Sequence, residues 1–218
     1  MLKNYAVNEV NKIGLLAVAI RSFKPSFNHT GFFYLTSQLS KKTRFCHLEG
    51  HLRLTDENAE DCPEYFWVES DLHKVHKKGV CALIKNIVFR NKNGLPYGFD
   101  SDGHSFSKDG LYNKSSNGEG LTCATFIMDV LSCLNFNMID KYDWPSREED
   151  EEWKKDIIEM LKKHASKGHV KALEGESLIY RFRPEEVAAA FSIGSKDWPA
   201  KYEDISPIAS IIKSSIEA

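Results

Sequence analysis

The chain has 218 residues, of which 42% are hydrophobic and 28% charged, with 29 basic against 31 acidic side chains. A chain of this length can bury a sizeable core, so its folding requires no metal or disulfide. Its net charge of -2 at pH 7 predicts no general affinity for nucleic acid or for an anionic membrane surface.

The apolar segments and the cysteines indicate the cellular compartment. The longest aliphatic run, residues 13–20, is far shorter than the roughly 20 apolar residues that cross a bilayer. Asparagines and Glu9 interrupt the N-terminal segment where a signal peptide needs an apolar stretch. The five cysteines are scattered and odd in number, unlike a disulfide framework. We expect a cytoplasmic protein without stable membrane insertion. Export by a dedicated secretion system is compatible with the same features, and the oligomeric state stays open.

The first ninety residues predict an antiparallel sheet, because segments rich in β-branched and aromatic residues alternate with polar breaks. The predicted strands cover residues 15–20, 30–36, 44–54, 65–69 and 80–89, with a candidate break at 85–86 in the last. Residues 91–120 predict a loop, because they contain Asn-Gly and Asp-Gly pairs such as Asn93-Gly94, Asp102-Gly103 and Asn117-Gly118.

Two helices are predicted after this loop. Residues 121–134 are apolar around almost the whole helical circumference, which indicates a buried helix. From Ser146 the chain is acidic first and basic later, the order that a helix dipole favours. We expect this second helix to continue through Leu161 and to end at Gly168.

The last segment predicts one more strand over 178–182 and a helix over 184–191, which Pro184 begins. The tail from Ser192 is expected at the periphery. The sequence therefore predicts an α+β protein with a core over residues 1–140 and a mainly helical extension over 141–218 that packs on the core.

Cys123 is the first candidate for chemistry. It follows the long loop and begins the predicted buried helix, where unpaired backbone N–H groups favour a thiolate. A lone cysteine at such a place is more often a small core residue. The interpretation as a nucleophile therefore depends on a partner histidine.

His29 is the candidate base. It stands at the start of the strongly apolar segment 30–35, and a thiol nucleophile needs an imidazole that accepts its proton. His104, in the loop before Cys123, is the alternative base. For either histidine alone, an exposed side chain is the simpler interpretation.

A third polar residue could orient the base. Residues 44–54 alternate, so that Cys46 and Leu48 fall on one face and His47, Glu49 and His51 on the other. If this strand pairs with the strand of His29, one of the three polar residues can accept the second ring N–H of His29. Glu69 is a further candidate for this role. A solvated sheet face is the alternative interpretation.

Four short motifs, in this order along the chain, carry a resemblance to a known superfamily. They are His29-Thr30-Gly31-Phe32-Phe33-Tyr34-Leu35, Phe45-Cys46-His47-Leu48, Leu95-Pro96-Tyr97 and Thr122-Cys123-Ala124-Thr125-Phe126-Ile127. Over residues 13–136 the chain resembles permuted NlpC-type papain-like proteins, which include bacterial amidohydrolases and the lecithin:retinol acyltransferase group. The resemblance implies a papain-like core, an antiparallel sheet packed on the helix that bears the nucleophile. It implies Cys123 as nucleophile, His29 as base and His47 as the orienting residue.

The resemblance implies acyl transfer through a cysteine thioester, with amide bonds of peptides or isopeptides as leading substrates and lipid esters second. A charged His29 would let Cys123 react well below the pH near 8.5 at which a free thiol ionises. The alternative is a catalytically inactive binding or immunity-type module with the same fold. No motif for an organic cofactor is present. A zinc site from Cys46, His47, His51 and Cys62 is not favoured, because no pair has the Cys-x-x-Cys spacing.

Overall fold

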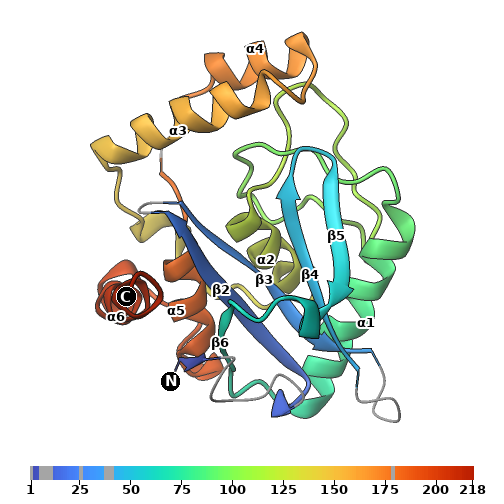
Figure 1. The fold of residues 1–218 in the computed structure, drawn as a ribbon, viewed down its shortest axis with the longest axis vertical. Coiled ribbons are helices and arrows are strands. Elements are labelled where there is room, and N and C mark those ends of the chain that lie inside the picture. The colour runs from blue at the N-terminus through green and yellow to red at the C-terminus, as the bar shows by residue number, and fades with distance from the viewer. Residues whose placement is uncertain (1, 5–11, 25–26, 37–41, 178–179) are drawn as a thin grey trace.

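The computed structural model describes residues 2–4, 12–24, 27–36, 42–177 and 180–218. The protein is α+β: the N-terminal part supplies an antiparallel sheet of order β1-β6-β2-β3-β4-β5, and the helices come mostly from the C-terminal part (Figure 1). The strands are β1 (Lys3–Asn4), β2 (Leu16–Lys24), β3 (Phe27–Leu35), β4 (Thr43–Gly50), β5 (Arg53–Asn58) and β6 (Phe66–Val68). The α-helices are α1 (Lys74–Arg90), α2 (Cys123–Ser132), α3 (Glu148–Leu161), α4 (Lys167–Gly175), α5 (Pro184–Ser192) and α6 (Tyr202–Ile216).

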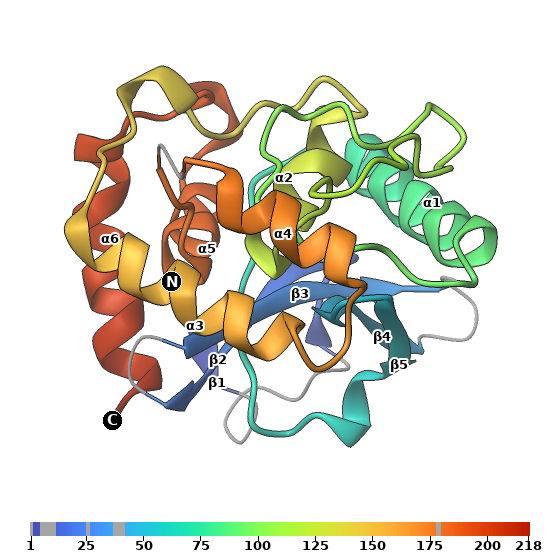
Figure 2. The same ribbon diagram turned by 90° about the horizontal axis from the view of Figure 1, so that it is seen from above.

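The two faces of the sheet differ in what covers them. Successive side chains of a strand point to opposite faces. Phe32 and Tyr34 of β3 belong to the main core, which α1, α2 and α5 cover (Figure 2). Phe33 belongs to a smaller cluster on the other face, together with Phe45 and residues of the segment 59–65. Gly31 and His29 share this second face with Phe33, because they lie two and four residues before it along β3.

The predicted strands over 15–20, 30–36 and 65–69 correspond to β2, β3 and β6. The strand predicted over 44–54 is instead a hairpin. The chain turns at His51 and Leu52, and Leu52 has a positive φ of 57°. The turn sends residues 53–58 back along β4 as β5, so that Thr55 pairs with His47.

The prediction of a strand over 80–89 is wrong, because these residues belong to α1. The buried side chains Val80, Leu83, Ile84 and Ile87 follow a spacing of three and four residues, which is the period of a helix. They pack on the sheet as one helical face. The β-branched composition that suggested a strand reflects burial on that face.

The predicted buried helix is α2, and the helix predicted from Pro184 is α5. Gly168 does not end the preceding helix: α3 ends at Leu161, and Gly168 lies inside α4, which Ser166 caps by accepting from the His169 N–H at 3.2 Å. Of the strand predicted over 178–182, residues 178–179 lie outside the described residues, and residues 180–182 are not in a strand.

The C-terminal third contributes to the main core. Helix α5 packs on β2, β3, β6 and α2, and Phe191 is fully buried. The tail after Ser192, expected at the periphery, forms α6, which packs on α5 and buries Ile205 and Ile212. Helices α3 and α4 instead cross one end of the sheet (Figures 1 and 2). None of the described helices is long and apolar enough to cross a membrane.

Candidate active site

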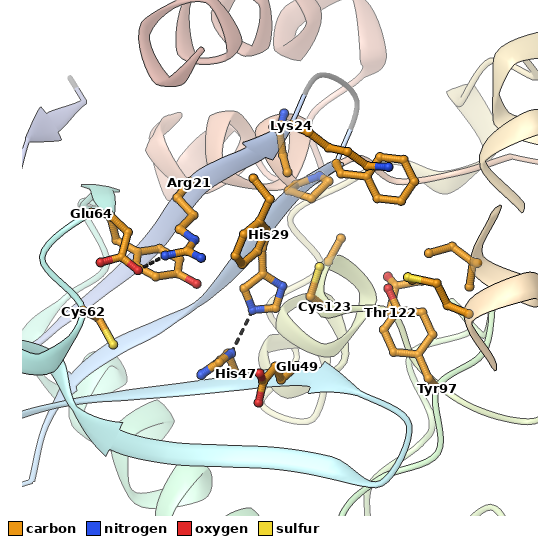
Figure 3. A pocket seen from close by; sticks show the side chains of 18 of the residues that line it. Arg21, Lys24, His29, His47, Glu49, Cys62, Glu64, Tyr97, Thr122 and Cys123 are labelled. Carbon is orange, nitrogen blue, oxygen red and sulfur yellow. Dashed lines mark hydrogen bonds and ion pairs between the residues drawn. The ribbon is translucent and has the colours of Figure 1, made fainter. Parts of the chain in front are cut away.

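A cavity of about 590 Å³ lies where β3 and β4 separate. The paired register of these strands stops at Phe32 and Cys46, although β3 begins at Phe27 and β4 ends at Gly50. The cavity is bounded by side chains from several distant parts of the chain (Figure 3). They include His29 from β3, His47 from β4, Cys123 from α2, Tyr97 from the loop between α1 and α2, and Trp153 from α3.

Gly31 makes room for the second histidine. A Cβ atom at Gly31 would lie 2.6 Å from the Cβ of His47 and 2.7 Å from the carbonyl oxygen of Cys46. Only a residue without a side chain lets His47 lie beside β3 at this point. The His47 ring stacks on Phe45 with centroids 4.2 Å apart, which fixes the plane of the imidazole.

The two histidines form a directed hydrogen-bonded chain that ends on Glu57 of β5. His47 Nε2 lies 3.0 Å from Glu57 Oε1, and His29 Nε2 lies 2.8 Å from His47 Nδ1. A carboxylate only accepts, so His47 carries its proton on Nε2 and accepts through Nδ1. His29 therefore donates from Nε2, and its Nδ1 keeps a free lone pair. Cys123 lies on the side of the His29 ring away from His47 (Figure 3).

Cys123 is the first residue of α2. The Thr122 side chain caps this helix by accepting from the Thr125 N–H at 3.0 Å, and the Thr125 hydroxyl accepts from the Thr122 N–H at 2.9 Å. The Cys123 N–H has no partner within the helix. Tyr97 lines the same cavity, and this N–H favours its phenolate. Burial and the Cys123 thiolate nevertheless raise the pKa of Tyr97.

The thiol and the base are both neutral in the unliganded protein. Burial raises the pKa of Cys123 to about 11, against the opposing effects of the Thr30 backbone and of Arg181. Burial, followed by His47 and Arg21, lowers the pKa of His29 to about 3. No hydrogen bond joins the thiol to the imidazole in the described part of the chain. A preformed thiolate–imidazolium pair, which the sequence predicted, is thus disfavoured by burial.

The candidates for the orienting role lie in different places. Among them His47 makes the hydrogen bond to His29. Glu49 lines the cavity but pairs with an arginine of β5 at 2.7 Å. His51 accepts from the backbone N–H of Tyr97 at 3.3 Å. Glu69 lies beyond β6, where it accepts from a backbone N–H and pairs with a lysine of β1.

His104, the alternative base, is exposed in the loop before α2 and does not line the cavity. The residues considered for zinc do not converge either, since Cys46 points to the face that the helices cover while His47 points into the cavity. Within the described ranges, no group of three His, Cys, Asp or Glu side chains has an arrangement that could hold a metal ion.

Sequence reasoning missed two groups that contribute to the site and did not assign a role to a third. Glu57 lies near the site because the chain turns at His51 and Leu52 and brings β5 beside β4. The sequence predicted one continuous strand over 44–54. Arg181 lies over the Trp153 ring, 3.9 Å from its centroid, and favours the thiolate of Cys123. Tyr97 stood in one of the motifs of the resemblance without a role of its own. For Glu57 and Arg181 no local sequence signal existed, because only tertiary packing brings them to the cavity.

Comparisons of the chain with protein-family models, with curated proteins and with solved structures gave no match.

Proposed function

We propose that the protein is a thiol-dependent acyl-transfer enzyme, most simply a hydrolase of an amide bond in a peptide or isopeptide. Cys123 acts as the nucleophile, His29 as the base and His47 as the orienting residue. The main support is the hydrogen-bonded chain from Glu57 through His47 to His29, because it leaves the Nδ1 lone pair of His29 free at the cavity that Cys123 also lines. We also propose a papain-like core, on the order of the motifs and on the Cys123 helix that packs against the sheet.

The first half of the reaction forms a thioester. As the Cys123 sulfur attacks the carbonyl carbon, its proton passes to His29 Nδ1, and the carbonyl oxygen becomes an oxyanion. The Cys123 N–H and the hydroxyl of Tyr97, which lines the same cavity, then donate to that oxyanion. The C–N bond breaks, and His29 returns the proton to the leaving amine.

The second half releases the acyl group. Water gives a proton to His29 while its oxygen attacks the thioester carbonyl, and the proton then returns to the departing Cys123 sulfur. An amine in place of water gives transfer instead of hydrolysis. Because the resting thiol and imidazole are neutral, the proton moves during the attack. The positive charge on His29 is then stabilised through His47 by Glu57.

A second candidate function is a binding or immunity-type module with no catalysis. The observation that favours it is the burial of Cys123 and His29, which disfavours the charged form of each. In such a module the hydrogen-bonded histidines would only stabilise the sheet.

Acylation by p-nitrophenyl acetate separates these functions without knowledge of the natural substrate. We expect a burst of nitrophenolate from the unaltered protein and an acetyl group on the peptide that contains Cys123. The Cys123→Ala variant should lose this acylation by roughly 10³-fold or more, with a stability change of at most about 1 to 2 kcal/mol. The Cys133→Ala variant, from the other end of α2, should keep it. Equal acylation of unaltered protein and Cys123→Ala would contradict the proposed function.

A further inference from the structure

Tyr97 lies in a loop, yet its side chain has a defined place in the cavity that Cys123 also lines (Figure 3). Part of this order comes from the segment that leads into α2. Tyr97 forms an isolated parallel bridge with Leu121, where the Leu121 N–H donates to the Pro96 carbonyl at 3.1 Å and the Gly98 N–H donates to the Leu121 carbonyl at 3.3 Å. The position of Tyr97 is therefore registered against a residue that is two positions before Cys123.

Two glycines allow this close approach. A Cβ atom at Gly98 would lie 2.9 Å from the Cα of Gly120, and one at Gly120 would lie 2.6 Å from the nitrogen of Gly98. The two backbones are thus in direct contact beside Tyr97. This contact sets the distance between the two backbone segments. The N–H and C=O groups of Tyr97 point away from it and need other partners.

Two histidines from distant parts of the chain bind the backbone N–H and C=O of Tyr97. His51 Nδ1, at the turn between β4 and β5, accepts from the Tyr97 N–H at 3.3 Å. His169 Nε2, in α4, lies 2.8 Å from the Tyr97 carbonyl oxygen. Since His169 Nδ1 accepts from the Gly118 N–H at 3.2 Å, its ring proton is on Nε2 and is donated to Tyr97. The two rings lie against each other with centroids 4.7 Å apart.

Both rings must be neutral to make these bonds. Burial, followed by His169 and His164, lowers the pKa of His51, so His51 keeps its accepting lone pair at neutral pH. His169 is only 5% exposed and uses both ring nitrogens. The backbone N–H and C=O of Tyr97 are therefore each bound by a neutral imidazole ring.

We propose that His51 and His169 are positioning residues that hold the Tyr97 backbone, so that its hydroxyl stays beside the Cys123 N–H and can donate to the oxyanion. This inference rests on the proposed function. It makes α4, which the sequence placed in a C-terminal extension, a part of the catalytic apparatus. It also explains why an unpatterned loop can supply a group that must be placed precisely enough for catalysis.

The first test compares variants of His169 in acylation by p-nitrophenyl acetate. His169→Leu removes both bonds and should lower the maximal acylation rate at least tenfold, with little change in the ester concentration that gives half of that rate. His169→Gln, whose side-chain amide can still donate to Tyr97 and accept from Gly118, should restore most of the rate. His104→Leu, which alters an exposed histidine that does not line the cavity, should act as the unaltered protein. Thermal unfolding of each variant verifies that it is folded.

The second test asks whether His169 acts through Tyr97. Tyr97→Phe should lower acylation by about 10²-fold, as expected for the loss of one oxyanion donor. In that background His169→Leu should cost less than a further twofold, because the hydroxyl that it positions is gone. Multiplicative losses in the double variant would overturn the proposal.

A third measurement needs no turnover. Loosening Tyr97 should open the cavity beside the thiol, so iodoacetamide should label Cys123 several times faster in His169→Leu than in the unaltered protein or in His169→Gln. Unchanged acylation and unchanged labelling in a folded His169→Leu would refute the inference and leave the proposed function intact. Loss of the dependence on Cys123 would refute the proposed function instead, while faster labelling would still support the hold on Tyr97.

Discussion

The two ends of α2 carry the same residue in opposite settings. Cys123 begins the helix at the cavity, beside His29, while Cys133 follows the last turn and donates to the Phe106 carbonyl at 3.6 Å. Burial raises the pKa of both thiols to about 11. The thiol pKa therefore does not distinguish a candidate nucleophile from a structural cysteine, although Cys123 is buried and Cys133 only partly so. The distinction lies in the neighbours: a directed chain of hydrogen bonds at one end and a single carbonyl at the other.

The largest expected effect on stability concerns acid. The pKa of His29 falls from 6.5 in the unfolded chain to about 3 in the folded protein. Between these values the unfolded chain binds one more proton at His29 than the folded protein does. The contribution of neutral His29 to the free energy of unfolding is therefore fully present above pH 6.5 and is lost as the pH falls through this window. The slope from this group is about 1.4 kcal/mol per pH unit, or roughly 2 to 3 kcal/mol between pH 6.5 and pH 4.5.

Urea unfolding at several pH values measures this slope. His29→Gln should reduce this slope by about 1.4 kcal/mol per pH unit, which corresponds to one proton. The contributions of other buried histidines should remain. His76→Gln serves as control at the Cys133 end, because His76 is exposed and its ring contacts Phe136 just beyond that end. Parallel slopes for His29→Gln and the unaltered protein would mean that His29 is not buried in its neutral form.

The second prediction compares two glycines, one near each end of α2. Gly31→Ala places a Cβ against His47 and a backbone carbonyl, and should lower the free energy of unfolding by about 1 to 3 kcal/mol. Gly79 lies in α1, where the nearest atom to an added Cβ is a Leu134 methyl at 3.7 Å. Gly79→Ala should raise stability by about 0.5 to 1 kcal/mol. If both substitutions changed the free energy of unfolding in the same direction, the close packing at Gly31 and the room for a Cβ at Gly79 would be refuted.

The third prediction compares two carboxylates. Glu57→Gln should reduce acylation about tenfold, because an amide both donates and accepts and no longer imposes one tautomer on His47. Asp129, one turn before Cys133, is fully buried and accepts from the Ser105 N–H at 3.2 Å. Asp129→Asn should leave acylation unchanged. Nitrogen NMR of the His47 ring would report the tautomer directly, and an unaltered tautomer in Glu57→Gln would contradict the role of Glu57.

The sheet and α2 could be predicted from the sequence because their apolar patterns are local. The error at α1 has a physical cause: Val80, Ile84 and Ile87 are strand formers by composition, but their spacing places them on one helical face. At this segment the spacing of the apolar residues, and not their composition, indicates the helix. The hairpin of β4 and β5 was missed because Leu52 takes a positive φ, which its residue type does not announce.

The site shows the same limit. His29, His47 and Cys123 were candidates by residue type and by their place at strand and helix ends, and the fold brings all three to one cavity. Glu57 and His169 were not candidates. The contact of Glu57 depends on a turn, and those of His169 depend on its place in α4, far along the chain from Cys123. No periodicity in the sequence encodes such contacts.

The packing of α5 on the sheet has a consequence for synthesis. Asn28 of β3 donates to Glu185 of α5 at 2.9 Å, across 157 positions of the chain. The apolar face that α5 covers is therefore synthesised before α5 and stays partly exposed until Pro184–Ser192 have been made. Contacts so distant in sequence slow folding, because a long loop must close before they form. We therefore expect chaperones that bind apolar segments to recognise this face of the sheet in the nascent chain before α5 covers it.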